Sequence, residues 1–262
     1  MAEVPNGKFV WYDLMTPDTG ASADFYTKLV GWSTMAFEGA PEGQPYDMWV
    51  NGEAPIGGMV KIGDELKKQG VKPHWISYVA VPDTDAAAAR AQELGGKVLH
   101  EPEDIPTVGR FAVVSDPQGA AFAVFTPAES SPGQAGPAKV GEFSWHELAT
   151  SDWNAAFEFY HSLFGWEIKE EHDMGEMGLY QIFGRSEDEF PSGGMFNKPP
   201  EMPVCAWTYY ISVQNVDDAV EKVKELGGQV LNGPMEVPGG DKVAQCMDPQ
   251  GAMFALHSSA GN

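Results

Sequence analysis

The sequence predicts an α+β fold made of two tandem domains, and three observations lead to this prediction. Residues 7–32 recur as residues 141–166, with the same aromatic, glycine and aspartate positions. Residues 93–125 recur in the same way as residues 225–257. Each repeated segment combines a strand pattern with a helix pattern. Because an internal repeat fixes how many structural units a chain contains, we expect two homologous halves, each with an early and a late module.

Each early module is predicted to begin with a strand and a helix. Apolar residues alternate along Phe9–Leu14 and Phe143–Leu148, as in a strand with one buried face. Asp18 and Asp152 occupy the N-cap positions of the helices that follow. Each helix carries three apolar residues on one face and ends at a glycine suited to a left-handed C-cap, followed by Trp. These residues are Ala21, Phe25, Leu29, Gly31 and Trp32 in the first copy, and Ala155, Phe159, Leu163, Gly165 and Trp166 in the second.

The remaining elements follow the same plan. Further strands are expected at Ser33–Phe37, Tyr46–Val50 and Ile56–Val60. Asp83 and Asn215 are expected to cap the late helices. Each Asp-Pro-Gln-Gly segment predicts a turn, because proline fixes φ and glycine accepts a positive φ. The late strands and helices are predicted at Trp75–Val81, Thr84–Leu94 and Ala120–Phe125, and at Trp207–Val213, Val216–Leu226 and Ala252–His257.

The domain boundaries follow from composition. Ala128–Lys139 is rich in Ser, Pro, Gly and Ala without an apolar period, which indicates a linker between domains 1–127 and 140–262. Gly63–Pro73 is expected to connect the two modules of the first half, and Asn197–Pro203 those of the second. The modules are then residues 7–62, 74–126, 141–196 and 206–258.

Composition limits the partners. The chain has 262 residues and a formal charge of −22, so its field repels nucleic acid and anionic membranes. The same charge either attracts a cationic small-molecule ligand or serves only solubility. The sequence lacks an apolar run long enough to span a bilayer, and its N-terminus does not resemble a signal peptide. Cys205 and Cys246 show no CxxC spacing. We therefore expect a reduced, cytoplasmic location, while the sequence leaves open whether the halves pair within one chain or in a homodimer.

Several motifs together resemble a known superfamily. They are Trp11-Tyr12-Asp13-Leu14, Phe25-Tyr26, Gly31-Trp32, Pro55-Ile56-Gly57-Gly58-Met59, Leu94-Gly95-Gly96 and Asp116-Pro117-Gln118-Gly119, with matching motifs in the second half. This combination is similar to the vicinal oxygen chelate superfamily, which includes glyoxalase I, extradiol dioxygenases and bleomycin or fosfomycin resistance proteins. The resemblance implies, in each half, two strand–helix–three-strand modules whose mixed sheet curls around a cleft. It does not fix the chemistry, because one fold hosts several functions.

The resemblance also implies where a metal would bind. The metal enzymes of this superfamily carry His or Glu ligands at four positions of the cleft. Here those positions are occupied by Trp11, Gly57, Ile76 and Ala123 in the first half, and by Trp145, Gly193, Thr208 and Ala255 in the second. Because none of these side chains is a good ligand for a divalent ion, we expect no metal cofactor.

Polar residues beside those positions are candidates for other chemistry. Since residues two apart on a strand share a face, Asp13 and His74 are expected to face the first cleft, and Glu147 and His257 the second. Either pair could bind a metal weakly or act as a base and its orienting group, or simply line a polar pocket. His146 is expected to face the helix instead.

Aromatic residues suggest ligand binding. Trp11, Trp49, Tyr78 and Phe125 are expected to line the first cleft, and Trp145, Tyr180 and Tyr210 the second. Such rings suit flat or cationic organic ligands, although they could also fill a closed cleft. The leading hypothesis is therefore a metal-free, ligand-binding relative of the superfamily. The alternatives are a lyase, isomerase or dioxygenase with non-standard ligands, a protein that sequesters an antibiotic or metabolite, and an interaction scaffold with filled clefts.

Other chemistries have little support in the sequence. No Gly-x-Ser-x-Gly motif occurs, and neither cysteine has a base placed beside it in the pattern. Gly57-Gly58 and Gly193-Gly194 are not followed by a helix, so they lack the geometry of a phosphate loop. We expect these glycines to allow a close approach between strands.

Overall fold

The computed structural model describes residues 4–40, 43, 45–129, 136–175 and 178–260. Residues 130–135 of the expected linker lie outside this set. Within the described residues, no helix is long and apolar enough to cross a membrane.

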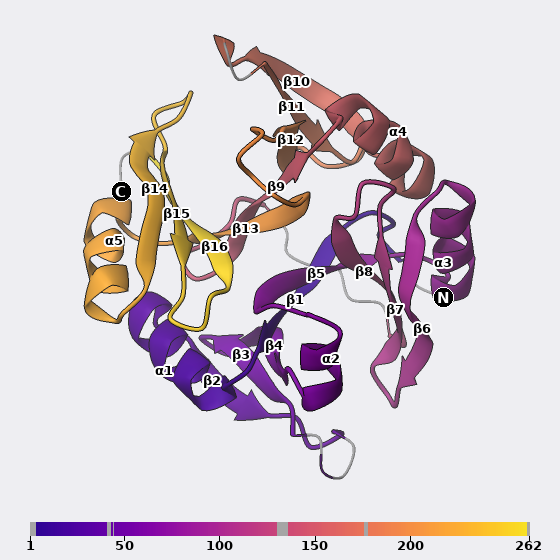
Figure 1. Cartoon of the computed structure of the whole chain (residues 1–262), viewed down its shortest axis with the longest axis horizontal. Helices are drawn as coiled ribbons and strands as arrows, with labels where there is room; N and C mark the ends of the chain where they lie inside the picture. The colour runs from indigo at the N-terminus through magenta and orange to yellow at the C-terminus, as the bar shows by residue number, and fades with distance from the viewer. Residues whose placement is uncertain (1–3, 41–42, 44, 130–135, 176–177, 261–262) are drawn as a thin grey trace. The chain divides into compact units, whose positions relative to one another are not determined.

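The first half contains two strand–helix–three-strand modules (Figure 1). The early module consists of β1 (Phe9–Thr16), α1 (Thr19–Val30), β2 (Ser33–Ala36), β3 (Asp47–Asn51) and β4 (Ala54–Lys61). The late module consists of β5 (His74–Ala80), α3 (Thr84–Glu93), β6 (Lys97–Ile105), β7 (Gly109–Ser115) and β8 (Ala121–Pro127). A short helix, α2 (Asp64–Lys68), lies in the connection between them, where the sequence predicted none.

The second half repeats the order. Its early module consists of β9 (Phe143–Thr150), α4 (Trp153–Phe164), β10 (Glu167–Asp173), β11 (Leu179–Gly184) and β12 (Gly193–Asn197). Its late module consists of β13 (Ala206–Ser212), α5 (Val216–Glu225), β14 (Gln229–Glu236), β15 (Lys242–Met247) and β16 (Met253–Ser258). The predicted fold class and the fourfold module plan are confirmed.

Local capping explains where the helices begin and end. The Asp18 carboxylate accepts a hydrogen bond from the Ala21 amide, and Gly31 ends α1 with a φ of 88°. Asp152 and Gly165 do the same for α4. The predicted buried face needs one correction, because Ala21 and Ala155 are exposed. The next residue along each helix, Ser22 or Ala156, is buried instead. It lies four positions before the buried Tyr26 or Tyr160, and residues four apart share a helix face.

The described strands form two mixed sheets of eight strands, and each sheet takes its strands from one half of the chain. Their orders are β2-β3-β4-β1-β5-β8-β7-β6 and β10-β11-β12-β9-β13-β16-β15-β14. Strands β1 and β4 are parallel, as are β9 and β12, while the neighbours of β4 and β12 on the other side run antiparallel. A Cβ atom on Gly57 would lie 2.0 Å from the Tyr12 carbonyl oxygen, and one on Gly193 would lie 2.0 Å from that of His146. The expected close approach of strands at these glycines is confirmed.

The chain also divides into two compact units that regroup the modules. The first unit comprises Met1–Trp11, Ser77–Pro137 and Trp145–Trp207, and the second comprises Tyr12–Ile76, Ala138–Ser144 and Thr208–Asn262. Within the first unit α3 packs beside α4, and within the second α1 packs beside α5 (Figure 1). Each unit therefore joins the early module of one half to the late module of the other. The domain boundaries expected from the repeat stay a prediction.

Each unit is held together by a buried Trp–Tyr–Asp chain. In the first unit the Trp207 indole donates to Tyr160 Oη at 3.0 Å, and Tyr160 Oη donates to Asp116 Oδ2 at 3.1 Å. Trp75, Tyr26 and Asp248 form the same chain with the same distances in the second unit. The other carboxylate oxygen of each aspartate accepts two backbone N–H groups of its own turn. The predicted turn residues thus also tie two modules of different halves together.

Candidate functional site

In the first unit, three predicted site residues form one hydrogen-bonded group. Trp145 and Glu147 lie on β9 and Tyr180 lies on β11. Tyr180 Oη donates to Glu147 Oε2 at 3.0 Å and accepts from the Trp145 indole N–H at 2.8 Å. All three side chains are half-buried. A carboxylate, a phenol and an indole thus meet on one face of the sheet.

The second unit contains the repeat equivalent of the Tyr180–Glu147 pair. Tyr46 Oη donates to Asp13 Oδ1 at 2.6 Å, and the Asp13 side chain is buried. Glycine makes room for both phenol rings. A Cβ atom on Gly58 would lie 2.1 Å from Tyr46 Oη, and one on Gly194 would lie 2.1 Å from the Tyr180 ring. The second glycine of each Gly-Gly motif therefore positions a tyrosine against its carboxylate.

Trp49, which was expected to line the first cleft, lies in the core instead. Its side chain is fully buried, and its ring packs in the second unit against Tyr26, Trp32 and Trp75, with ring centroids 5.4–6.2 Å apart. Tyr46 stands three positions earlier, and an odd number of steps along a strand reverses the face. Trp49 is therefore a core residue of the helix-covered side, and its ring has no exposed face to offer a ligand.

The other predicted aromatic residues lie on central strands. Tyr78 on β5 and Phe125 on β8 are neighbours, with ring centroids 6.2 Å apart and planes at 82°. Tyr210 on β13 is buried, and its carbonyl oxygen lies 3.3 Å from Ser144 Oγ on β9. Trp11 on β1 is half-buried. Their role in ligand binding stays a prediction.

The two predicted histidines have different surroundings. His74 Nδ1 lies 2.7 Å from the Lys72 carbonyl oxygen, and burial lowers the His74 pKa although this hydrogen bond opposes the change. His257 in the second unit lies between two side chains that the sequence did not single out. Its Nδ1 is 3.0 Å from Ser144 Oγ, and its Nε2 is 2.9 Å from Asp241 Oδ2.

The side chain of His146 is buried. Its ring stacks on Phe9 with centroids 3.6 Å apart and planes 5° apart, and its Nδ1 donates to the Ser192 carbonyl at 2.6 Å. Burial lowers the pKa of His146 to about 4. Burial also raises the pKa of the Cys246 thiol to about 12. Neither group is suited to acid–base or thiolate chemistry near neutral pH.

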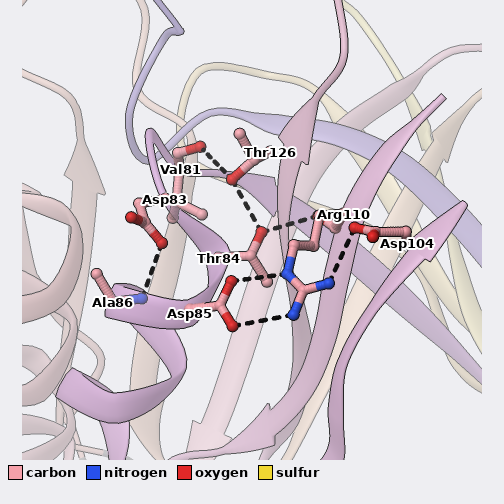
Figure 2. Close-up of polar contacts among 8 residues, drawn as sticks. All are labelled: Val81, Asp83, Thr84, Asp85, Ala86, Asp104, Arg110 and Thr126. Carbon is pink, nitrogen blue, oxygen red and sulfur yellow. Dashed lines mark hydrogen bonds and ion pairs between the residues drawn. The ribbon is translucent and has the colours of Figure 1, made fainter. Parts of the chain in front are cut away.

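A surface cavity of about 330 Å³ lies at the end of the β6–β7 hairpin in the first unit. Figure 2 shows Arg110, which lines this cavity together with Asp104. Its guanidinium binds Asp85 through two hydrogen bonds of 2.6 and 3.0 Å and Asp104 through one of 2.9 Å. These ion pairs hold the pKa of Asp85 below its usual range and raise that of Arg110. These hydrogen bonds join α3 to the hairpin. They also occupy most of the guanidinium's donors, so few remain for an anionic ligand.

The described residues contain no group of three or more His, Cys, Asp or Glu side chains that could hold a metal ion. Three polar residues of the observed clusters were missed by the sequence analysis: Tyr46, Ser144 and Asp241. Tyr46 could have been found from the repeat, since it occupies the position of Tyr180. Ser144 and Asp241 carry no local pattern, because strand pairing alone brings them to His257.

Comparison with known proteins decides the family. The family model for the Glyoxalase/Bleomycin resistance protein/Dioxygenase superfamily matches residues 8–124 and 142–256. The chain belongs to this superfamily. The predicted resemblance and the two tandem copies are thereby confirmed.

Several known proteins are similar in sequence to this chain along most of its length. The anthracycline biosynthesis protein DauV of Streptomyces sp. (strain C5) is 31% identical, with 98% of this chain and 94% of that protein covered. The putative glyoxylase CFP32 of Mycobacterium tuberculosis is also 31% identical, with 97% of this chain and 96% of that protein covered.

Solved structures share the fold. The Mn(II)-bound glyoxalase of Novosphingobium aromaticivorans matches with a TM-score of 0.66 at 16% identity, over 98% of this chain and 83% of its own. Homoprotocatechuate 2,3-dioxygenase of Arthrobacter globiformis matches with a TM-score of 0.66 at 14% identity, over 98% of this chain and 81% of its own. At such identities the likeness concerns the fold alone.

Proposed function

We propose that this glyoxalase-superfamily protein binds a flat, cationic aromatic molecule without the divalent metal that enzymes of the fold use. The observation that carries the proposal is the group formed by Glu147, Tyr180 and Trp145. Its carboxylate accepts a hydrogen bond from the phenol at 3.0 Å, and a carboxylate is the anionic acceptor that forms strong, charge-assisted hydrogen bonds with a cationic donor. The indole and phenol rings supply surfaces on which a planar ligand can stack.

The residues at the expected metal positions support a metal-free site. A divalent ion in this fold needs imidazole or carboxylate donors around an open coordination position. The second half instead offers an indole at Trp145, a backbone methylene at Gly193, a hydroxyl at Thr208 and a methyl group at Ala255. These residues do not fit the metal. The sheet itself keeps Gly193 side-chain-free, because a Cβ atom there would strike the neighbouring strand.

The ligand class is inferred from charge and from relatives. The formal charge of −22 attracts cations to the protein. Two relatives from Streptomyces are named anthracycline biosynthesis proteins, and anthracyclines are flat polycyclic aromatic compounds. For this chain we propose a ligand of the same chemical class, a planar polycycle that carries an amino group.

A fluorescence titration tests the proposal. Metal-stripped protein is titrated with a fluorescent anthracycline that bears an amino sugar, and quenching of ligand and tryptophan fluorescence is followed. We expect saturable, salt-sensitive binding that EDTA does not change. Glu147→Gln should weaken binding at least about tenfold, because a hydrogen bond to a charged group is worth about 1.5–3 kcal/mol. Tyr180→Phe keeps the stacking ring and should weaken binding less.

The matched control is Glu158→Gln, which removes one exposed carboxylate from α4 and leaves the group intact. It changes the net charge as Glu147→Gln does, so equal effects of the two variants would reduce the result to bulk electrostatics and contradict a specific site. Binding that disappears with EDTA, or lactoylglutathione lyase or ring-cleavage activity with a stoichiometric metal, would favour the superfamily's metal chemistry instead.

A further inference from the structure

The second unit holds a connected Ser–His–Asp chain. Ser144 comes from β9, His257 from β16, and Asp241 immediately precedes β15. The distances are 3.0 Å from Ser144 Oγ to His257 Nδ1 and 2.9 Å from His257 Nε2 to Asp241 Oδ2. The histidine and aspartate side chains are 18% and 37% exposed, and Ser144 is half-buried. Solvent and small reagents can therefore reach these three side chains.

Hydrogen-bond direction fixes the role of each group. An ionised carboxylate only accepts, so Asp241 requires a proton on His257 Nε2, and in the neutral imidazole Nδ1 then keeps its lone pair. Ser144 Oγ then donates to Nδ1; the alternative acceptor, the Tyr210 carbonyl, is farther away at 3.3 Å. Asp241 is itself held by the Ala260 amide at 2.7 Å. Burial acts to raise the Asp241 pKa, but the hydrogen bonds from His257 and Ala260 lower it overall.

The first half provides an internal comparison. At the positions of Ser144, Asp241 and His257 it has Val10, Gly109 and Phe125. There the Phe125 ring lies directly over Gly109, so that a Cβ atom on the glycine would be 2.6 Å from the ring. The fold thus accepts residues without polar side chains at these positions. The second half has polar side chains with complementary donors and acceptors at all three positions, which structural packing does not require.

The geometry points to a nucleophilic site in the second half, in which His257 activates Ser144 and Asp241 orients His257, acting on small activated esters or thioesters. The sequence analysis found no pattern for such a site, because strand pairing alone brings these three side chains together. A hydroxyl paired with a base that a third group orients is the general arrangement of an activated serine. This site uses none of the residues of the Glu147 group.

The reaction balances without a further reagent except water. Ser144 Oγ forms a bond to the acyl carbon as the bond from that carbon to the leaving oxygen or sulfur breaks. The hydroxyl proton passes to His257 Nδ1 and then to the leaving alcohol or thiol. Water, deprotonated by the same nitrogen, then adds to the acyl carbon. The bond from that carbon to Ser144 Oγ breaks, the proton returns from Nδ1 to Oγ, and a carboxylic acid leaves.

Covalent labelling of the intact protein tests the site. A fluorophosphonate probe is incubated with the wild type and variants, the labelled peptide is identified by mass spectrometry, and p-nitrophenyl acetate turnover is measured in parallel. We expect one modified serine, Ser144, and loss of labelling in Ser144→Ala. His257→Phe, which installs the residue of the first half, should slow labelling at least about 100-fold. Ser162→Ala, on the exposed face of α4, should change nothing.

The variants need a check that folding is preserved. Asp241→Asn keeps the size of the side chain and should slow labelling about tenfold at an unchanged thermal midpoint, so it tests the site even if His257→Phe unfolds. The inference is overturned if folded Ser144→Ala is labelled as fast as the wild type, if the label sits on another residue, or if urea-unfolded protein reacts equally fast.

Discussion

The buried histidine of β9 offers a direct test of the packing that the structure describes. His146 is 7% exposed and stacks on Phe9 within the first unit. Burial lowers its pKa from the ordinary value of 6.5 to about 4, against an opposing hydrogen bond to the Ser192 carbonyl. Because the folded-state pKa lies below the unfolded one, the unfolded chain takes up this proton first as pH falls. The stabilisation is complete above about pH 6.5 and is lost as pH falls through about 4.

The two pKa values set the size of the effect. They differ by about 2.5, and each unit corresponds to about 1.4 kcal/mol of unfolding free energy, which gives about 3 kcal/mol in all. Other groups titrate in the same range. Burial raises the pKa of Asp116 and Asp248, so their contribution has the opposite sign, present at low pH and lost as pH rises. The effect of His146 must therefore be isolated as a difference between two proteins.

The assay is urea denaturation of the wild type and His146→Phe between pH 4.5 and 8. The stability of the wild type relative to the variant should fall by about 2–3 kcal/mol from the top of this range to the bottom. Tyr12→Phe is the matched control, because Tyr12 is the repeat equivalent of His146 and stacks on Phe143 at 3.8 Å. Burial raises the Tyr12 pKa further above 10, so its difference curve should be flat. A flat curve for His146→Phe as well would refute the buried placement.

Three further outcomes follow from contacts described above. Tyr160→Phe leaves a buried indole N–H and a carboxylate oxygen without their phenol, and should cost about 1–3 kcal/mol in urea denaturation; an unchanged midpoint would contradict the buried chain. Gly194→Ala places a Cβ atom 2.1 Å from the Tyr180 ring and should weaken anthracycline binding about tenfold, whereas Gly20→Ala, whose Cβ finds its nearest atom at 3.5 Å, should not. Cys246, with a pKa of about 12, should react with iodoacetamide at pH 8 at least about 100-fold more slowly in the folded protein than after unfolding, as mass spectrometry can measure.

The sequence predicted the elements well because each is specified locally. Alternation along Phe9–Leu14, the N-cap at Asp18 and the C-cap at Gly31 all describe neighbouring residues, and the repeat supplies each feature twice. Helix α2 was missed because its five residues, four of them charged and one a leucine, carry no apolar period. The regrouping of modules into compact units was missed for another reason. Contacts such as Tyr160 to Asp116 join positions 44 residues apart, and nothing local records them.

In the site, too, locally specified features could be predicted and long-range contacts could not. Glu147 and Tyr180 could be predicted because strand periodicity assigns each to a face. The same rule, applied from Tyr46, would have placed Trp49 in the core, where the structure has it. His257 was singled out for its face, but its partners Ser144 and Asp241 depend on how β9, β15 and β16 approach one another. Side-chain identity predicts what a residue can do, whereas its partner is set by tertiary structure.

The most direct test of the proposed function is a crystal structure of the protein grown with an amino-sugar anthracycline and without chelator. We predict density for the polycycle against Trp145 and Tyr180, with its amino group near Glu147 and no ion coordinated by protein side chains. A metal ion bound through side chains of either half, with the ligand's oxygens completing its coordination, would contradict the account.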